Sequence, residues 1–166
     1  GIAGVGGTSV DNYIDTTTEA KVENNTEITA DRTHIGTGNA IPTGAYDDTN
    51  DKDATDAQTF TMKDHFGGVI SGNRLRSLID VKENGTVTIG DKAKITTNHL
   101  QEYIAASENK LTDLVEAKGG GAIAVTDAVS EFALKIHNNV NVGSGATLSN
   151  EKAASTEDIT IAAYDS

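Results

Sequence analysis

The chain has 166 residues, enough for one domain of ordinary size, but only 36% of them are hydrophobic and 4% aromatic, which excludes a compact aromatic core. The net charge of −12 produces a surface that repels phosphate backbones, so the composition argues against nucleic acid as a partner. The lack of cysteine excludes disulfides, thiolate chemistry and cysteine-based zinc sites. Abundant Thr, Asn, Asp and Gly beside small aliphatic residues predict short strands separated by turns.

The start of the sequence shows neither a charged segment nor an apolar segment of the kind that directs export. No apolar run approaches the roughly 20 residues that a membrane helix needs. The chain begins at Gly1, and we interpret it as a piece of a longer protein that does not insert into a membrane.

An eight-residue phrase occurs twice, as KVENNTEI in residues 21–28 and as KIHNNVNV in residues 135–142. Both copies have apolar residues at alternate positions and an Asn pair in the same place, which is typical of half-buried strands next to a corner. We therefore predict that the copies are equivalent, with Val22 and Ile28 facing inward like Ile136 and Val142.

Residues 43–61 contain almost no aliphatic side chains and are predicted to form a long acidic loop. Its carboxylates and an Asn carbonyl are the oxygen ligands that Ca²⁺ prefers. The spacing lacks the Gly and the closing Glu of an EF-hand loop, so a solvated loop is favoured over a calcium site. The calcium-ligand candidates are Asp47, Asp48, Asn50, Asp51, Asp53 and Asp56.

Residues 79–95 contain a third, looser copy that matches residues 140–148, with Gly90 over Gly143, Ala93 over Ala146 and Ile95 over Leu148. The shared pattern, apolar-x-apolar-Gly-x-x-Ala-x-apolar, describes two short strands bent at a glycine. One such ribbon cannot bury its apolar side alone, so we predict stacked parallel strands about 4.8 Å apart. Residues 1–166 would then be one all-β, β-solenoid segment; the alternative is an antiparallel sandwich with Asn-Asn and Asn-Gly hairpins.

Residues 98–118 break this pattern because their apolar residues recur at helical spacing. Asn98 and Gln101 would cap an amphipathic helix at its start, and Gly119 would end it. We expect an inserted helix that covers one face of the stack; a docking helix for a partner is the alternative.

The sequence contains few residue combinations that are typical of a catalytic site. Asp64, His65 and Ser71 could be imagined as a triad, but a chain rich in Ser and Asp offers such sets by chance. None of the four histidines has a second ligand at metal-binding spacing, so we predict no catalytic residue and no cofactor; the histidines are His34, His65, His99 and His137.

The segment AGVGGTSVDNYIDTTTEAKV in residues 3–22 resembles the repeated unit of filamentous-haemagglutinin-like proteins, and above all that of leukotoxin-type filamentous adhesins exported by two-partner secretion. EITADRTHIGTGNAI in residues 27–41 and ITIAAYDS in residues 159–166 are similar in style. The resemblance implies a right-handed parallel β-helix in a secreted or surface-bound bacterial exoprotein, a virulence factor or toxin that crosses an outer-membrane secretion pore unfolded. The acidic loop and the helix depart from the repeat of that family.

The leading hypothesis is a non-enzymatic, rigid stalk that presents loops to a host-cell surface molecule. The alternative is a polysaccharide lyase or hydrolase, since such enzymes use carboxylates along one face of a parallel β-helix. That alternative needs acidic residues that converge beside a basic partner such as Arg74 or Arg76. A purely structural extracellular spacer is the third reading.

Overall fold

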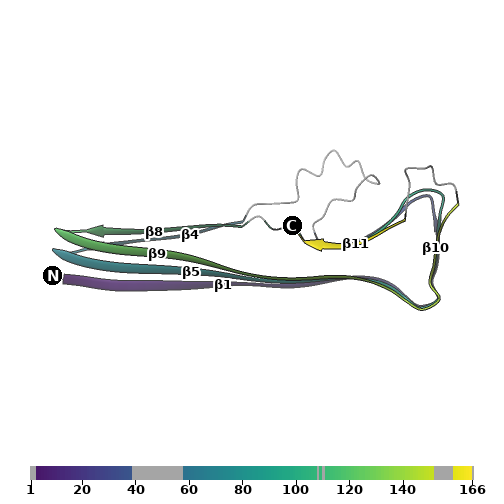
Figure 1. The fold of residues 1–166 in the computed structure, drawn as a ribbon, viewed down its shortest axis with the longest axis horizontal. Coiled ribbons are helices and arrows are strands. Elements are labelled where there is room, and N and C mark those ends of the chain that lie inside the picture. Colours follow the sequence, from purple (N-terminus) through teal and green to yellow (C-terminus); the bar gives the residue numbers. More distant parts are fainter. Residues whose placement is uncertain (1–2, 39–57, 108, 110, 152–158, 166) are drawn as a thin grey trace. The chain divides into compact units, whose positions relative to one another are not determined.

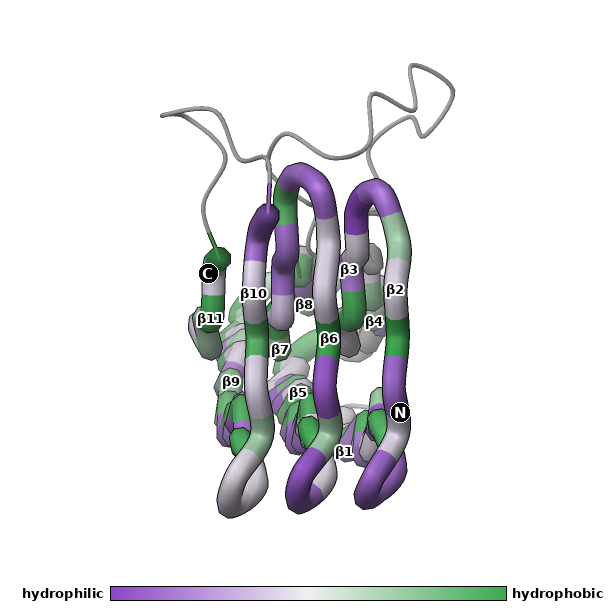
Figure 2. Tube along the Cα trace, turned by 90° about the vertical axis from the view of Figure 1, so that its right-hand side faces the viewer, coloured by the Kyte–Doolittle hydropathy of each residue, from purple (hydrophilic) through white to green (hydrophobic). Residues whose placement is uncertain are grey.

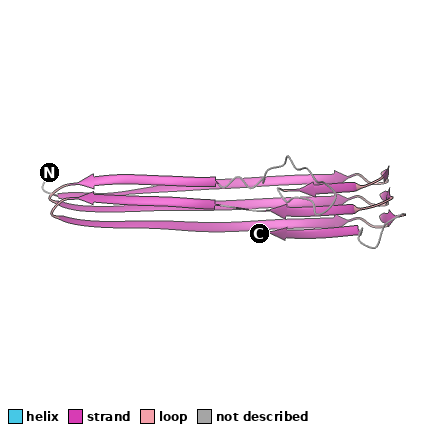
Figure 3. Ribbon diagram, turned by 90° about the horizontal axis from the view of Figure 1, so that it is seen from above, coloured by secondary structure: helices cyan, strands magenta, loops and turns pink. Residues whose placement is uncertain are grey.

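The computed structural model describes residues 3–38, 58–107, 109, 111–151 and 159–165, and every regular element in these ranges is a β-strand (Figures 1 and 3). The prediction of an all-β chain is therefore confirmed. The strands in chain order are β1 (Ala3–Val22), β2 (Glu27–Ala30), β3 (Thr33–Thr37), β4 (Gln58–Gly67), β5 (Ile70–Ile89), β6 (Lys94–Thr97), β7 (Gln101–Ser107), β8 (Leu111–Gly120), β9 (Ile123–Val142), β10 (Thr147–Asn150) and β11 (Ile159–Asp165).

The chain runs three times through the same order of strands, and we call these runs pass one (β1–β4), pass two (β5–β8) and pass three (β9–β11). Equivalent strands lie side by side in sheets ordered β1-β5-β9, β2-β6-β10 and β3-β7-β11 and in the pair β4-β8, as Figure 2 shows for β2, β6 and β10. The pairings in the last three sheets are parallel. The antiparallel sandwich is therefore wrong for these sheets.

The corner that follows β1, β5 and β9 is tied together by a ladder of side chains. The Asp91 N–H donates to Asn24 Oδ1 at 2.8 Å, across 67 residues of sequence, and the Ser144 N–H donates to Asp91 Oδ1 at 2.8 Å, across 53 residues. Leu148, Ile95 and Ile28 are paired in the next strands. The predicted alignment of Gly90, Ala93 and Ile95 with the third pass is thus confirmed.

The predicted equivalence of residues 21–28 with residues 135–142 is wrong. Asn25 lies in the corner with φ of 58°, whereas Asn138 and Asn139 lie inside β9. The similarity does not extend beyond the two phrases. Strands with alternating apolar residues match each other at any even shift of the alignment, whereas the corner hydrogen bonds select one alignment. Val142, expected to face inward like Val22, is 46% exposed on the last strand of its sheet.

The predicted helix over residues 98–118 is also wrong: this segment contains β7 and most of β8. β7 is buried along its whole length between β3 and β11, and a strand buried on both faces loses the period-two pattern that distinguishes it from a helix. Gly119 is not a helix end, since it pairs with Phe66 in the β4-β8 sheet. This segment therefore provides neither a helix that covers the stack nor a helix that docks a partner.

The described strands belong to two compact units, and β1, β5 and β9 contribute residues to both. Unit 1 comprises residues 1–15, 56–82 and 110–135, and unit 2 comprises residues 16–55, 83–109 and 136–166. Of the predicted acidic loop, residues 58–61 form the start of β4, and residues 43–57 lie outside the described part of the chain.

Unit 2 has an apolar core built from the inward residues of all three sheets. Val22, Ile89 and Ile95 are buried there, together with the ring of Tyr103. The Tyr103 hydroxyl donates to Gln101 Oε1 at 2.7 Å, and Gln101 Nε2 donates to the Ser149 carbonyl at 2.7 Å, so the buried polar atoms at this corner are paired.

Unit 1 has a more polar interior between the first half of the β1-β5-β9 sheet and the β4-β8 pair. The Thr8 hydroxyl donates to Asp64 Oδ2 at 3.4 Å, and the Ser130 hydroxyl donates to Asp113 Oδ2 at 2.6 Å. Among the described residues, the Ser71 hydroxyl and both amide atoms of Asn73 are buried without a hydrogen-bond partner.

Candidate functional site

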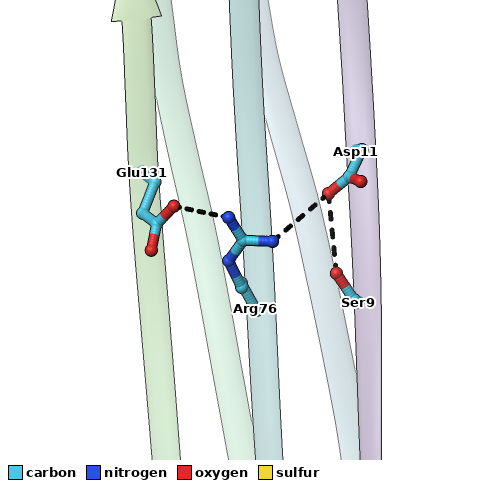
Figure 4. A network of polar contacts seen from close by, with 4 residues as sticks. All are labelled: Ser9, Asp11, Arg76 and Glu131. Atoms are coloured by element: carbon cyan, nitrogen blue, oxygen red, sulfur yellow. Dashed lines mark hydrogen bonds and ion pairs between the residues drawn. The ribbon is translucent and has the colours of Figure 1, made fainter.

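The outward side chains of β1, β5 and β9 in unit 1 form a ladder of ion pairs (Figure 4). Arg76 on β5 lies between two carboxylates: its Nη2 is 2.7 Å from Glu131 Oε2 on β9, and its Nη1 is 3.9 Å from Asp11 Oδ1 on β1. The Ser9 hydroxyl contacts the same Asp11 oxygen at 3.5 Å. The period-two alternation of the strands places these side chains on one face.

The same arrangement recurs along these strands. Arg74 Nε lies 3.2 Å from Asp127 Oδ2, and Lys82 Nζ lies 3.3 Å from Asp15 Oδ2. The cations come from the second pass and the anions from the first and third passes. We call this set the charged ladder; its members are Asp11, Asp15, Arg74, Arg76, Lys82, Asp127 and Glu131.

The electrostatics of the pair Arg76 and Glu131 favour its ionised state. The hydrogen bond and charge of Arg76 lower the pKa of the Glu131 carboxyl, and Glu131 raises the pKa of the Arg76 guanidinium for the same reasons. A general acid at neutral pH needs a carboxyl pKa that is raised. The pair Arg76 and Glu131 is therefore suited to holding two passes in register, and the Glu131 carboxyl is unsuited to protonating a leaving group.

A second charged cluster lies on the outer side of β4 and β8. Glu116 contacts Lys118 Nζ at 2.6 Å and Lys63 Nζ at 3.3 Å, and both hydrogen bonds lower the pKa of its carboxyl. With Asp64 and His65 these residues line a depression of about 180 Å³. This carboxyl, like that of Glu131, is held in its ionised form.

The residues of the imagined triad do not converge. Asp64 and His65 are consecutive in β4, so their side chains leave opposite faces of the strand. Asp64 is held by the Thr8 hydroxyl and by the backbone N–H of His65, which lies 2.7 Å from its Oδ1. Ser71 is buried, and its hydroxyl would lie 3.2 Å from a Cβ at Gly119 on the facing sheet. Nothing in this set provides a nucleophile and a base in contact.

Sequence reasoning missed the pair His34 and Glu102, which hold the same place in β3 and β7. His34 Nδ1 lies 3.4 Å from Glu102 Oε2, within range of an ion pair, although the orientation does not form a hydrogen bond between these two atoms. The Glu102 side chain is 1% exposed. No pattern in the sequence indicated this contact, because the helix predicted over residues 98–118 placed Glu102 on a solvated surface.

A pocket of about 300 Å³ in unit 2 is lined by polar side chains and glycines: Thr16, Thr18, Gly38, Glu83, Asn84, Gly85 and Ser107. Glu83 Oε2 accepts a hydrogen bond of 3.1 Å from Asn109 Nδ2. Asn138 donates to the Ser107 hydroxyl at 3.2 Å. Glu83 is the one carboxylate among the described lining residues, whereas glycoside hydrolysis uses a pair.

The remaining predicted site residues contribute no further site. The calcium candidates, Asp47, Asp48, Asn50, Asp51, Asp53 and Asp56, lie outside the described residues. Within the described part of the chain, no three His, Asp or Glu side chains are close enough to hold a metal ion. His99 lies 3.7 Å from Asp31, and His137 is exposed on β9.

Comparisons with protein-family models, with curated proteins and with solved structures gave no match to this chain. The described residues include no helix of the length and apolarity that a membrane span requires.

Proposed function

We propose that this chain is a segment of a right-handed parallel β-helix in a large secreted bacterial exoprotein, a filamentous adhesin of the haemagglutinin-like and leukotoxin type. It acts without catalysis, as a rigid stalk that presents loops at the bacterial surface to a molecule on the host cell. Export of the parent protein proceeds through an outer-membrane secretion pore, and the lack of cysteine suits a chain that is threaded unfolded.

The observation that carries the proposal is the threefold repetition of one strand order with parallel neighbours. Every added pass supplies a further row of backbone hydrogen bonds and a further layer of side-chain contacts, so length can grow without a new kind of core. The repeated strands β1, β5 and β9 have 20 residues each, so every added pass brings a long row of paired backbone groups.

The presenting role is assigned to segments between strands rather than to the strand faces. The charged ladder leaves its cations paired with carboxylates of neighbouring strands, so that face offers few unpaired charges to a ligand. Residues 43–57, between β3 and β4, carry a cluster of Asp residues and are the segment proposed to meet the host cell.

The test measures binding of the fluorescently labelled chain to host cells by flow cytometry. A variant with residues 43–57 replaced by a Gly/Ser linker of equal length is the matched comparison. We expect saturable binding by the chain and loss of binding by the variant, with unchanged circular dichroism. If neither protein binds, the presentation role fails and a structural spacer remains.

A second candidate is an enzyme that acts on acidic polysaccharides, favoured by Arg74 and Arg76 beside the carboxylates of Asp127 and Glu131. Incubation with acidic polysaccharides would then release reducing ends or unsaturated products, and Arg76→Gln would abolish the release. The stalk proposal expects no product from either protein.

A further inference from the structure

The corner after β1, β5 and β9 has one column of equivalent residues, Glu23, Gly90 and Gly143, and the two glycines lie against the preceding pass. A Cβ at Gly90 would lie 2.6 Å from the backbone nitrogen of Asn24, and a Cβ at Gly143 would lie 2.6 Å from the backbone nitrogen of Asp91. Neither clash can be relieved by a flexible side chain, because both atoms belong to the backbone of the pass below. Glycine is therefore required wherever another pass lies against this position.

Glu23 occupies the same place in the first pass, and it has a side chain. Its side chain is 71% exposed, and its carboxylate lies 3.0 Å from Lys21 Nζ. Its Cβ and charge occupy the space that a pass stacked on the β1–β2 edge would need for its own corner backbone. A charged residue at this place acts as a block against edge-to-edge stacking.

At the same corner, the opposite edge leaves an apolar side chain exposed. Val22 and Val142 are the same residue type at equivalent places, yet Val22 is 6% exposed and Val142 is 46% exposed. Ile161 on β11 is likewise exposed, although Tyr103, its partner in β7, is fully buried. In the corner ladder, Asn24 and Asp91 each accept the next N–H, so the hydroxyl of Ser144 stands where the next acceptor is needed.

We propose that the edge formed by β9 and β10 is built to receive one further parallel pass that carries glycine in the column of Gly90 and Gly143. The β1–β2 edge is closed at this corner by Glu23. A second copy of this chain cannot stack there, because its β1–β2 edge would have to lie against the β9–β10 edge, and the β1–β2 edge carries Glu23. The inference deepens the proposed function, whose stack of passes it rests on, by giving that stack a direction.

The experiment replaces Glu23 by Gly or Ala and measures whether copies of the chain then stack end to end. One preparation carries Asn139→Cys on β9, and a second carries Glu19→Cys on β1; repetition of the observed spacing would bring these exposed positions together only across an end-to-end contact. The chain has no native cysteine, so a disulfide between the two preparations reports that contact alone. The Glu19→Cys preparation is made with Glu23, Glu23→Ala and Glu23→Gly.

We expect the Glu23→Gly mixture to yield at least about tenfold more disulfide-linked dimer than the Glu23 mixture, a factor that corresponds to 1.4 kcal/mol. Glu23→Ala removes the charge but keeps the Cβ, so it should behave like Glu23. Circular dichroism should be the same for all three proteins, because residue 23 is exposed. Equal cross-linking in all three mixtures, or none with Glu23→Gly, would overturn the inference. The host-cell assay is independent of this result, so the two proposals can fail separately.

Discussion

The two units are built from the same three passes but differ in what fills their interiors. Unit 2 has a cluster of buried aliphatic side chains and one buried tyrosine, beside buried polar residues such as Gln101, whose amide is hydrogen-bonded. In unit 1 the inward residues of β5 include Ser71, Asn73 and Ser77, and charged residues are paired outside. Parallel pairing between strands of successive passes occurs in both units, so we infer that backbone pairing defines the fold, whereas side chains decide how strongly each unit holds it.

The largest effect is expected from truncation in the core of unit 2. Ile95→Ala removes a fully buried side chain that packs between Ile28 and Leu148, and the free energy of unfolding should fall by about 4 kcal/mol. Leu75→Ala in unit 1 should cost about 2 kcal/mol, because the buried residues on either side of it in β5, Asn73 and Ser77, are polar and contribute fewer apolar contacts. Urea unfolding followed by circular dichroism measures both. A larger loss for Leu75→Ala would reverse the comparison.

A second prediction concerns the corner glycine. Gly90→Ala should lower the free energy of unfolding by about 1–3 kcal/mol, because the added Cβ meets backbone atoms of the first pass. Gly72→Ala, within β5, is the matched control, because the nearest atom to a Cβ there is Val5 Cγ1 at 3.9 Å. The control should leave the free energy of unfolding unchanged. Equal thermal melting of the two variants would contradict the account of the corner.

Buried amides separate the two units further. Gln101→Leu should lower the free energy of unfolding by about 1–3 kcal/mol. The substitution removes two hydrogen bonds, so the Tyr103 hydroxyl and the Ser149 carbonyl lose their partner. Asn73→Val should gain about 1 kcal/mol, because neither amide atom of Asn73 has a partner among the described residues. Denaturant midpoints test both signs, and a loss of stability with Asn73→Val would mean that this amide is paired.

Tyr103 gives a pH test of the same core, since burial raises the pKa of its hydroxyl above the usual value near 10. A raised folded pKa means that the stabilisation is complete below the unfolded pKa and is lost as the pH rises from there toward the folded pKa. Thermal melting should therefore fall above about pH 10. Tyr103→Phe should show less of this alkaline loss; an unchanged loss would assign it to other groups.

The smallest effect is expected at the charged ladder. The folded pKa of Glu131 is depressed by Arg76, so the pair contributes stability above the unfolded carboxyl pKa and loses it as the pH falls through the folded pKa. Arg76→Gln should lower the melting temperature slightly at pH 7 in low salt and leave it unchanged in acid. Lys92→Gln removes the same charge in a turn and should leave the melting temperature unchanged at both pH values. Identical acid profiles for the two variants would remove the ion pair from the account.

Part of this architecture could be read from the sequence. The pattern around Gly90 and Gly143 predicted parallel stacking and the correct alignment of Ile95 with Leu148, because a glycine forced by close backbone approach occurs at this place in the second and third passes. β7 could not be recognised, since burial on both faces erases the alternation that marks a strand. The partners of Arg76 were equally hidden, because they depend on unequal pass lengths that only the register reveals.

The central claim is that the three passes lie in parallel register, and dipolar electron paramagnetic resonance tests it most directly. Spin labels at Glu27→Cys and Thr147→Cys would occupy the outer strands of the β2-β6-β10 sheet, each paired with Lys94. Two strand spacings of about 4.8 Å put the labelled backbones about 10 Å apart, and we expect strong dipolar broadening that singly labelled proteins lack. Spectra without broadening, which would mean a separation beyond about twice that distance, would contradict the parallel stack.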